Sequence, residues 1–266
     1  MKAPLEQNES VLTYLEKVTS LVRDTLGQDL KGLYLHGSGA QSDYNQGTSD
    51  IDILGVVATG SISDAQRSKL VSRLTHDALP VPAKGLEIIL CPEDAVCEPV
   101  LDLPFDFALS TGHSWPTQCE PRGTASDSLI NITLCRQSGI SLFGPPPDQV
   151  LAPVPRDLLR EALIEEIEWH QQNLFVEPEG ATPENAVLNA ARSLYAAETG
   201  RILSKSEGAR WWLERYPEDE LVAGALAIRK GEQTAALEEA RTRNFLARAK
   251  SLIEAMPPEP IAPRSL

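Results

Sequence analysis

Residues 33–57 read LYLHGSGAQSDYNQGTSDIDILGVV and contain two apolar runs that each meet polar residues at one end. The first run ends at Gly37-Ser38, as a strand that stops at a glycine turn does, and eleven residues separate this pair from Asp50. The second run, Ile51 to Val57, predicts another strand. Side chains two apart on a strand project from the same face, so the carboxylates of Asp50 and Asp52 are expected to share one face of a sheet.

Two carboxylates side by side repel each other and gain nothing from burial, so the pair indicates a bound divalent cation. Magnesium prefers oxygen ligands and is usually held by one or two carboxylates together with substrate phosphates. Gly37 lets the backbone approach a phosphate, and Ser38 offers that phosphate a hydroxyl and an N–H. Ser49 is a second candidate hydroxyl donor. The stretch therefore predicts nucleotidyl transfer assisted by Mg²⁺.

A third carboxylate follows in the run GLEIIL, residues 85–90, which predicts a further strand. Glu87 stands in the middle of this run, where a lone charge is costly unless it has a task. If the two strands are neighbours, Glu87 can bind a metal ion or accept the proton of an attacking hydroxyl. An acid pair by itself is more often a solvated strand end. The glycine-serine turn, the spacing and Glu87 together make Asp50, Asp52 and Glu87 the candidate catalytic and metal-binding residues.

The pattern of the chain changes near residue 155. Before it, expected helices (residues 6–26, 63–78 and 127–137) alternate with expected strands (32–37, 51–57, 85–90 and 105–109). Prolines at 145–147, 153 and 155 indicate a segment that is neither helix nor central strand. Helices alone are expected after it, near 157–175, 183–199, 204–215, 218–230 and 232–255. We therefore expect an α/β domain over residues 1–155, with a mixed sheet flanked by helices, and an all-α bundle over 156–266.

The bulk composition excludes several classes of protein. The formal net charge of −14 argues against a nucleic-acid substrate, because binding a phosphate backbone normally needs a basic face. It favours a small ligand and is compatible with a cationic one. No apolar run is close to the length of a membrane helix, which is about 20 residues. Residues 1–10 lack the features of a secretory signal. We expect a cytoplasmic monomer, with Cys91 and Cys135 as buried free thiols.

Gly37-Ser38, Asp50-Ile51-Asp52 and Glu87 resemble the signature of the polymerase-β-type nucleotidyltransferase superfamily. More narrowly, most of residues 30–235 resembles the aminoglycoside adenylyltransferases that inactivate spectinomycin and streptomycin. The second part of this resemblance is the segment 184–217, ENAVLNAARSLYAAETGRILSKSEGARWWLERYP. The resemblance implies transfer of AMP from ATP to a hydroxyl of such an antibiotic, with Mg²⁺ held by the three acids and Glu87 as the base.

The resemblance also assigns roles to residues outside the acid cluster. In that family Asn, Arg and Lys recur at the positions of Asn185, Arg192 and Lys205. It implies that Arg192 and Lys205 bind the triphosphate when the two domains close on ATP, and that Asn185 lies on the substrate side. Taken without the resemblance, Lys205 is a first-turn charge beside the capping pattern of Ser204 and Glu207, and such a lysine is usually only solvated.

The sequence indicates the identity of the antibiotic less clearly than it indicates the reaction. Streptomycin-accepting members share a Trp and two acids where this chain has Asn173, Pro178 and Thr182, so we expect spectinomycin to be favoured. Glu177, Glu179 and Glu184 lie nearby and can meet a cationic amine, and we take Glu177 and Glu184 as the candidate substrate-binding acids.

Trp115, in the segment TGHSW, falls where the family has a Trp that stacks on substrate, and a buried core role is an equal alternative. Two other functions remain open. One is a nucleotidyltransferase that modifies a protein or acts as a toxin–antitoxin or regulatory partner. The other is an RNA-tailing enzyme, which the net charge disfavours.

Overall fold

The computed structural model describes residues 8–45, 47–174 and 182–257. The chain folds as two compact units, Met1–Pro153 and Val154–Leu266. Each unit has its own secondary structure: the sheet belongs to the first unit, and the second contains helices α7 to α11.

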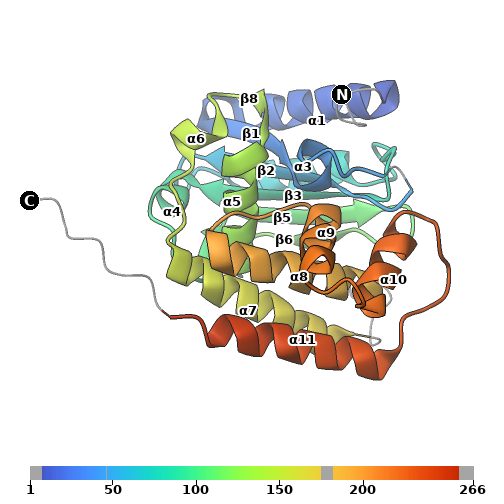
Figure 1. The fold of residues 1–266 in the computed structure, drawn as a ribbon. Helices are drawn as coiled ribbons and strands as arrows, with labels where there is room; N and C mark the ends of the chain where they lie inside the picture. The colour runs from blue at the N-terminus through green and yellow to red at the C-terminus, as the bar shows by residue number, and fades with distance from the viewer. Residues whose placement is uncertain (1–7, 46, 175–181, 258–266) are drawn as a thin grey trace, which may run out of the picture. The chain divides into compact units, whose positions relative to one another are not determined.

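The first unit is built on a six-stranded mixed sheet with the order β6-β5-β3-β2-β1-β8 (Figure 1). The strands are β1 (Leu30–His36), β2 (Ile51–Val57), β3 (Gly85–Pro92), β5 (Phe107–Gly112), β6 (Gln118–Glu120) and β8 (Ile140–Phe143). β2 and β3 run parallel, and the other neighbouring pairs run antiparallel. The expected mixed sheet flanked by helices is confirmed, and β2 and β3 are neighbours, as a site containing Glu87 requires.

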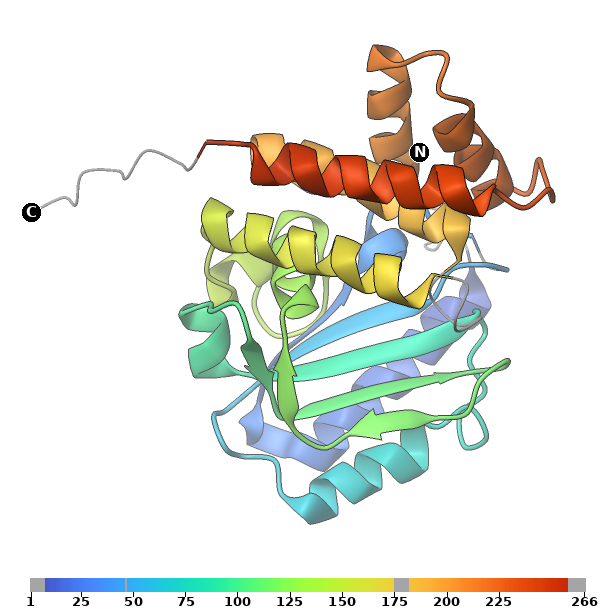
Figure 2. The same ribbon diagram turned by 90° about the horizontal axis from the view of Figure 1, so that it is seen from below.

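Helices cover both faces of this sheet (Figure 2). α1 (Glu9–Leu26) and α3 (Asp64–Leu74) pack on one face, and α5 (Asp127–Ser138) packs on the other, against β1 and β2. α1 begins at Asn8, whose side chain accepts a hydrogen bond from the Val11 N–H, and its apolar stripe closes the core over the sheet. α3 begins with a capping box made by Ser63 and Gln66, so its start is fixed locally.

Shorter elements complete the first unit: η2 (Gly27–Asp29), α2 (Gly37–Ala40), α4 (Glu93–Cys97), α6 (Pro147–Val150) and a two-stranded sheet of β4 (Leu103–Phe105) and β7 (Gly123–Ala125). Two expectations were wrong here. The single strand expected over 105–109 is split at Asp106, whose N–H binds the Leu90 carbonyl at 2.8 Å. The proline-rich segment contains a helical turn, because Pro147 occupies a first helical position, where its missing N–H costs nothing.

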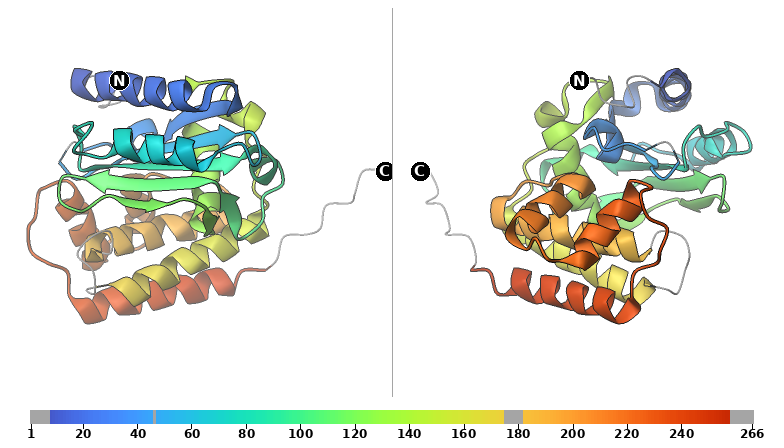
Figure 3. Two further views of the ribbon diagram at one scale, coloured as in Figure 1. Left: turned by 180° about the vertical axis from the view of Figure 1, so that it is seen from behind. Right: turned by 45° about the vertical axis from the view of Figure 1, so that its right-hand side comes forward.

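The second unit contains α7 (Arg156–Asn173), α8 (Pro183–Thr199), α9 (Lys205–Arg215), α10 (Glu220–Arg229) and α11 (Glu239–Glu254). α8 contacts each of the other four, and most of its residues are buried. α7 and α11 lie side by side (Figure 3). The helical bundle is thus as expected, except that α11 begins at Glu239, so the expected start at residue 232 was wrong. Of the described helices, none is long and apolar enough to cross a membrane.

The four cysteines are free thiols. Cys91 and Cys135 are buried, as expected, and burial raises the pKa of each thiol to about 12. Neither is therefore a ready nucleophile at neutral pH.

Candidate active site

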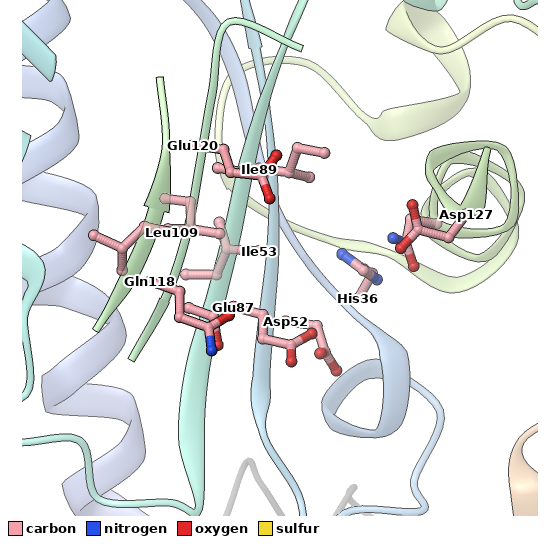
Figure 4. A pocket seen from close by; sticks show the side chains of 13 residues that line it. His36, Asp52, Ile53, Glu87, Ile89, Leu109, Gln118, Glu120 and Asp127 are labelled. Atoms are coloured by element: carbon pink, nitrogen blue, oxygen red, sulfur yellow. The ribbon is translucent and has the colours of Figure 1, made fainter. Parts of the chain in front are cut away.

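The expected acids belong to a row of polar side chains that crosses the sheet. Strand register places His36 opposite Asp52, Asp52 opposite Glu87, Glu87 opposite Ser110, and Ser110 opposite Gln118. Side chains of register partners project from the same face, so all five side chains of the row lie on one face. These five residues line one pocket, and Figure 4 shows Asp52, Glu87 and Gln118 grouped together in it.

Gly37 fits closely against one of these acids. It has φ +62°, in the left-handed region, at the point where β1 passes into α2. A Cβ added at Gly37 would lie 2.1 Å from Oδ2 of Asp52, in the space that the carboxylate itself occupies. Only glycine is therefore compatible with both the backbone conformation and the position of Asp52. Ser38 follows in the first turn of α2 and is partly exposed.

Asp50 lies just before β2 rather than within it, so it is not in the row. Its charge acts on Tyr44: burial, with a further contribution from Asp50, raises the pKa of the Tyr44 hydroxyl. Ser49 is buried, and its hydroxyl oxygen accepts a hydrogen bond of 3.0 Å from the Asn45 N–H. The Ser49 hydroxyl thus closes a local turn and still has its own proton to donate.

The pocket also takes polar side chains from elements that sequence reasoning did not connect with the acids. Asp127 and Asn131 enter it from α5, and Glu120 enters from β6 (Figure 4). In the described parts of the chain, no group of three or more His, Cys, Asp or Glu side chains is placed to hold a metal ion by itself.

Trp115 lies in the first unit, near the row but outside the set of pocket-lining residues. Its ring packs on two glycines: a Cβ added at Gly85 or Gly112 would lie 2.3 or 2.6 Å from it. Its indole N–H donates a hydrogen bond of 3.1 Å to the Ser110 hydroxyl, and Lys84 Nζ lies 5.3 Å from the ring centre. The side chain is partly exposed, so stacking on a substrate stays a prediction.

The other candidate residues lie on the second unit. Lys205, at the start of α9, donates a hydrogen bond to Oδ1 of Asn185 on α8. Arg192 on α8 lies 3.7 Å from Glu166 on α7, measured from Nη2 to Oε1. The expected capping box at the start of α9 is present, with Ser204 accepting from the Glu207 N–H.

Glu184 accepts a hydrogen bond of 2.5 Å from the Thr182 hydroxyl at the start of α8. The candidate Glu177 lies outside the described residues.

Three residues of the row were missed from the sequence: His36, Ser110 and Gln118. His36 directly precedes the Gly37-Ser38 pair, and this adjacency was the signal available for it. Ser110 and Gln118 had none, because their place depends on the pairing of β5 with β3 and of β6 with β5.

The second unit matches a known domain. The family model described as the aminoglycoside adenylyltransferase C-terminal domain matches residues 149–253. Relatives that align with more than three quarters of the chain agree with this match. An aminoglycoside (3'') (9) adenylyltransferase of Klebsiella pneumoniae is 29% identical over 219 residues, 78% of this chain and 80% of that protein. A spectinomycin 9-adenylyltransferase of Staphylococcus aureus is 26% identical over 218 residues, 79% of this chain and 81% of that protein.

This chain is similar to aminoglycoside adenylyltransferases over most of its length, and residues 149–253 match the C-terminal domain of that family. It is therefore an enzyme of the nucleotidyltransferase class. Its fold is similar to that of the spectinomycin adenyltransferase of Enterococcus faecialis solved with ATP and spectinomycin, with a TM-score of 0.70 at 18% identity. That match covers 91% of this chain and 99% of the solved one.

Proposed function

We propose that this adenylyltransferase transfers AMP from ATP to a hydroxyl of an aminocyclitol antibiotic, with Mg²⁺, and that the modification confers resistance. The observation that carries the proposal is the register of Asp52 against Glu87, which places two acids side by side in the sheet. The names of the relatives support the reaction, and the ATP and spectinomycin in the solved neighbour support the two substrates.

The residues present fit a magnesium ion. Asp52 and Glu87 supply carboxylate oxygens from adjacent strands, and the absence of a Cβ at Gly37 keeps the space for the Asp52 carboxylate open. Two carboxylates completed by phosphate oxygens are the usual magnesium site, and Asp50 is placed just before the same strand. Asp50, Asp52 and Glu87 would hold the ion only together with phosphate oxygens of ATP, and the bound ion would supply positive charge to the α-phosphate.

Glu87 is the residue best placed to take the proton. Its side chain is exposed to the pocket, so an acceptor hydroxyl can reach it, whereas Asp52 is partly buried against Gly37. In the reaction the hydroxyl oxygen bonds to the α-phosphorus, the bond to pyrophosphate breaks, and the hydroxyl proton passes to the carboxylate of Glu87. Gly37, Ser38 and Ser49 are proposed to bind phosphate oxygens near β2.

Arg192 and Lys205 are proposed to bind the triphosphate. Each is already held by a second side chain, Arg192 by Glu166 and Lys205 by Asn185, which reduces the rotamer freedom that phosphate binding would otherwise remove. For the acceptor we propose spectinomycin before streptomycin, with Trp115, Asn185, Glu177 and Glu184 on its side of the site.

The experiment compares full-length Asp50→Asn, Asp52→Asn and Glu87→Gln with the wild type. Transfer of AMP from labelled ATP to spectinomycin is followed at saturating Mg²⁺. Each variant is expected to keep its fold, because these side chains serve cation binding and proton transfer rather than packing. Glu87→Gln should bind both substrates yet lose about 10²–10⁴ in rate, the contribution of a general base.

Glu120→Gln is the matched control, since Glu120 lines the same pocket but pairs with Ala108 and lies outside the row. It should stay close to the wild type. Turnover by Asp52→Asn within about tenfold of the wild type would refute the two-carboxylate site.

A further inference from the structure

A polar layer is buried between α7 and α8 in the second unit. Glu166 and His170 lie one turn apart on α7, and Asn189 and Arg192 face them from α8. The Asn189 amide nitrogen lies 2.8 Å from His170 Nε2, and both side chains are buried. The side chains of Arg192 and Glu166 are 12% and 16% exposed, so their charges are largely removed from water.

This ion pair is poor as a device for stability. Its atoms are 3.7 Å apart, longer than a charge-assisted hydrogen bond, and Oε2 of Glu166 has no hydrogen-bond partner among the described residues. Removing two charges from water costs more than one loose contact returns, and apolar side chains of the same size usually stabilise such a position better. The stability of the helical bundle therefore does not explain the Arg192–Glu166 ion pair, and a functional role is the better explanation.

The backbone that carries Arg192 is fixed by its neighbour α9. A Cβ added at Gly208 would lie 2.7 Å from Cβ and 2.8 Å from Cα of Arg192, so α9 sits directly against this turn of α8. Lys205 lies one turn before Gly208 on the same helix. This contact fixes the backbone of Arg192 on α8 close to the turn of α9 that carries Lys205. The direction of the Arg192 guanidinium is then set by its side-chain partners.

The neighbouring His170 does not compete with Arg192 for the negative charge of Glu166. Burial lowers the pKa of His170 to about 4, against a smaller opposing effect of Glu166, so the ring is neutral at neutral pH. Glu166 therefore directs its negative charge at Arg192 without neutralisation by His170. Because a guanidinium carries N–H groups on three nitrogens, contact at Nη2 leaves the others for a second anion.

We propose that Glu166 is a positioning residue that orients the guanidinium of Arg192 for the phosphates of ATP. The inference rests on the proposed function, in which Arg192 binds the nucleotide. Glu166 itself touches no substrate, so its loss acts on ATP affinity through Arg192. It leaves the acceptor and the proton transfer untouched.

The test uses the full-length enzyme with Glu166→Gln, which keeps the size of the side chain and removes its charge. Glu168→Gln is the matched control: it lies on the same helix and also forms an ion pair, with Lys250 at 2.6 Å, but on another face. Glu166→Gln is expected to raise the KM for ATP about tenfold while the KM for spectinomycin stays unchanged. Glu168→Gln should change neither, and Glu166→Asp should recover part of the loss.

Direct titration with a non-hydrolysable ATP analogue and a thermal unfolding curve accompany the kinetics. A purely structural ion pair would lower Tm and leave the affinity of the folded protein for the analogue as in the wild type, and that result overturns the proposal for Glu166. Arg192→Ala separates the two levels of the argument. If it leaves ATP affinity unchanged, the proposed role of Arg192 fails; if it weakens ATP and Glu166→Gln does not, only the positioning role fails.

Discussion

Replacing Gly37 by alanine tests how closely the turn after β1 is fitted to Asp52. Gly37 has φ +62°, and an added Cβ would lie 2.1 Å from the Asp52 carboxylate oxygen. The substitution therefore has two separate consequences: it places a side chain in a left-handed backbone conformation, and it forces a carboxylate of the proposed metal site to move.

The two effects have different sizes and different readouts. A left-handed conformation costs a residue with a Cβ about 1–2 kcal/mol, which in a chain of this size lowers Tm by a few degrees. Nonbonded heavy atoms rest about 3.5 Å apart, and the added Cβ would lie 2.1 Å from the Asp52 oxygen, so the carboxylate must shift by about 1.4 Å. Misplacing a group of the active site by about this distance lowers the rate of the chemical step by about 10²-fold.

The assay is AMP transfer from ATP to spectinomycin, together with a thermal unfolding curve. Gly60→Ala is the matched control, because Gly60 also has a positive φ, +69°, but nothing lies within 4 Å of an added Cβ. Both variants should lose similar stability, and only Gly37→Ala should lose about 10² in kcat. If the two variants are equally active, Gly37 serves the backbone alone and the steric reasoning about Asp52 is wrong.

Two further predictions concern the second unit and the acceptor. His170 has a pKa lowered to about 4 by burial, so the unfolded chain binds more protons than the folded one between about pH 6.5 and 4. Over that window the free energy of unfolding should fall by about 3 kcal/mol as the pH is lowered. His170→Gln should remove this part of the dependence of the free energy of unfolding on pH. The same pH dependence in both proteins would contradict the prediction. Spectinomycin should be adenylylated at least about tenfold better than streptomycin by kcat/KM, because Asn173 and Thr182 offer no aromatic face or carboxylate to a guanidino group; a preference for streptomycin would show that these positions were misread.

The parts of the fold that could be predicted from the sequence are those fixed by local chemistry. The helices capped by Ser63 and Ser204 each begin where expected, since a cap is complete within four residues. The strand starting at Ile51 has the expected bounds, because the run follows Asp50 and ends just before the turn at Thr59 and Gly60.

Where tertiary contacts decide, local pattern was not enough. Asp106 interrupts an apolar run because its backbone N–H binds Leu90, while its carboxylate lies 3.2 Å from Nε of Arg122 and 4.0 Å from Nη2 of Arg67. None of these three partners is near Asp106 in sequence, so the contacts that break the run between β4 and β5 could not be predicted locally.

The same distinction applies to the candidate site. Asp52 and Glu87 could be found because an acid inside an apolar run is visible in the sequence itself. His36, Ser110 and Gln118 complete the row only through the order of β1, β2, β3, β5 and β6, which is a property of the whole sheet.

The two sets of candidate residues are held in physically different ways, and this difference bears on how each can contribute to the reaction. Asp52 and Glu87 are placed by strand register, so the positions of their backbone and Cβ atoms are set by the sheet. Arg192 and Lys205 have long side chains whose direction depends on partners, Glu166 and Asn185. Fixed carboxylates suit a step in which the reacting atoms must be placed within a fraction of an ångström. Cationic side chains held by a partner suit the binding of a flexible polyphosphate, because part of the entropy cost of ordering these side chains is met before the ligand binds. Changes around the sheet row should therefore act mainly on kcat, and changes around the α7–α8 polar layer mainly on the affinity for ATP.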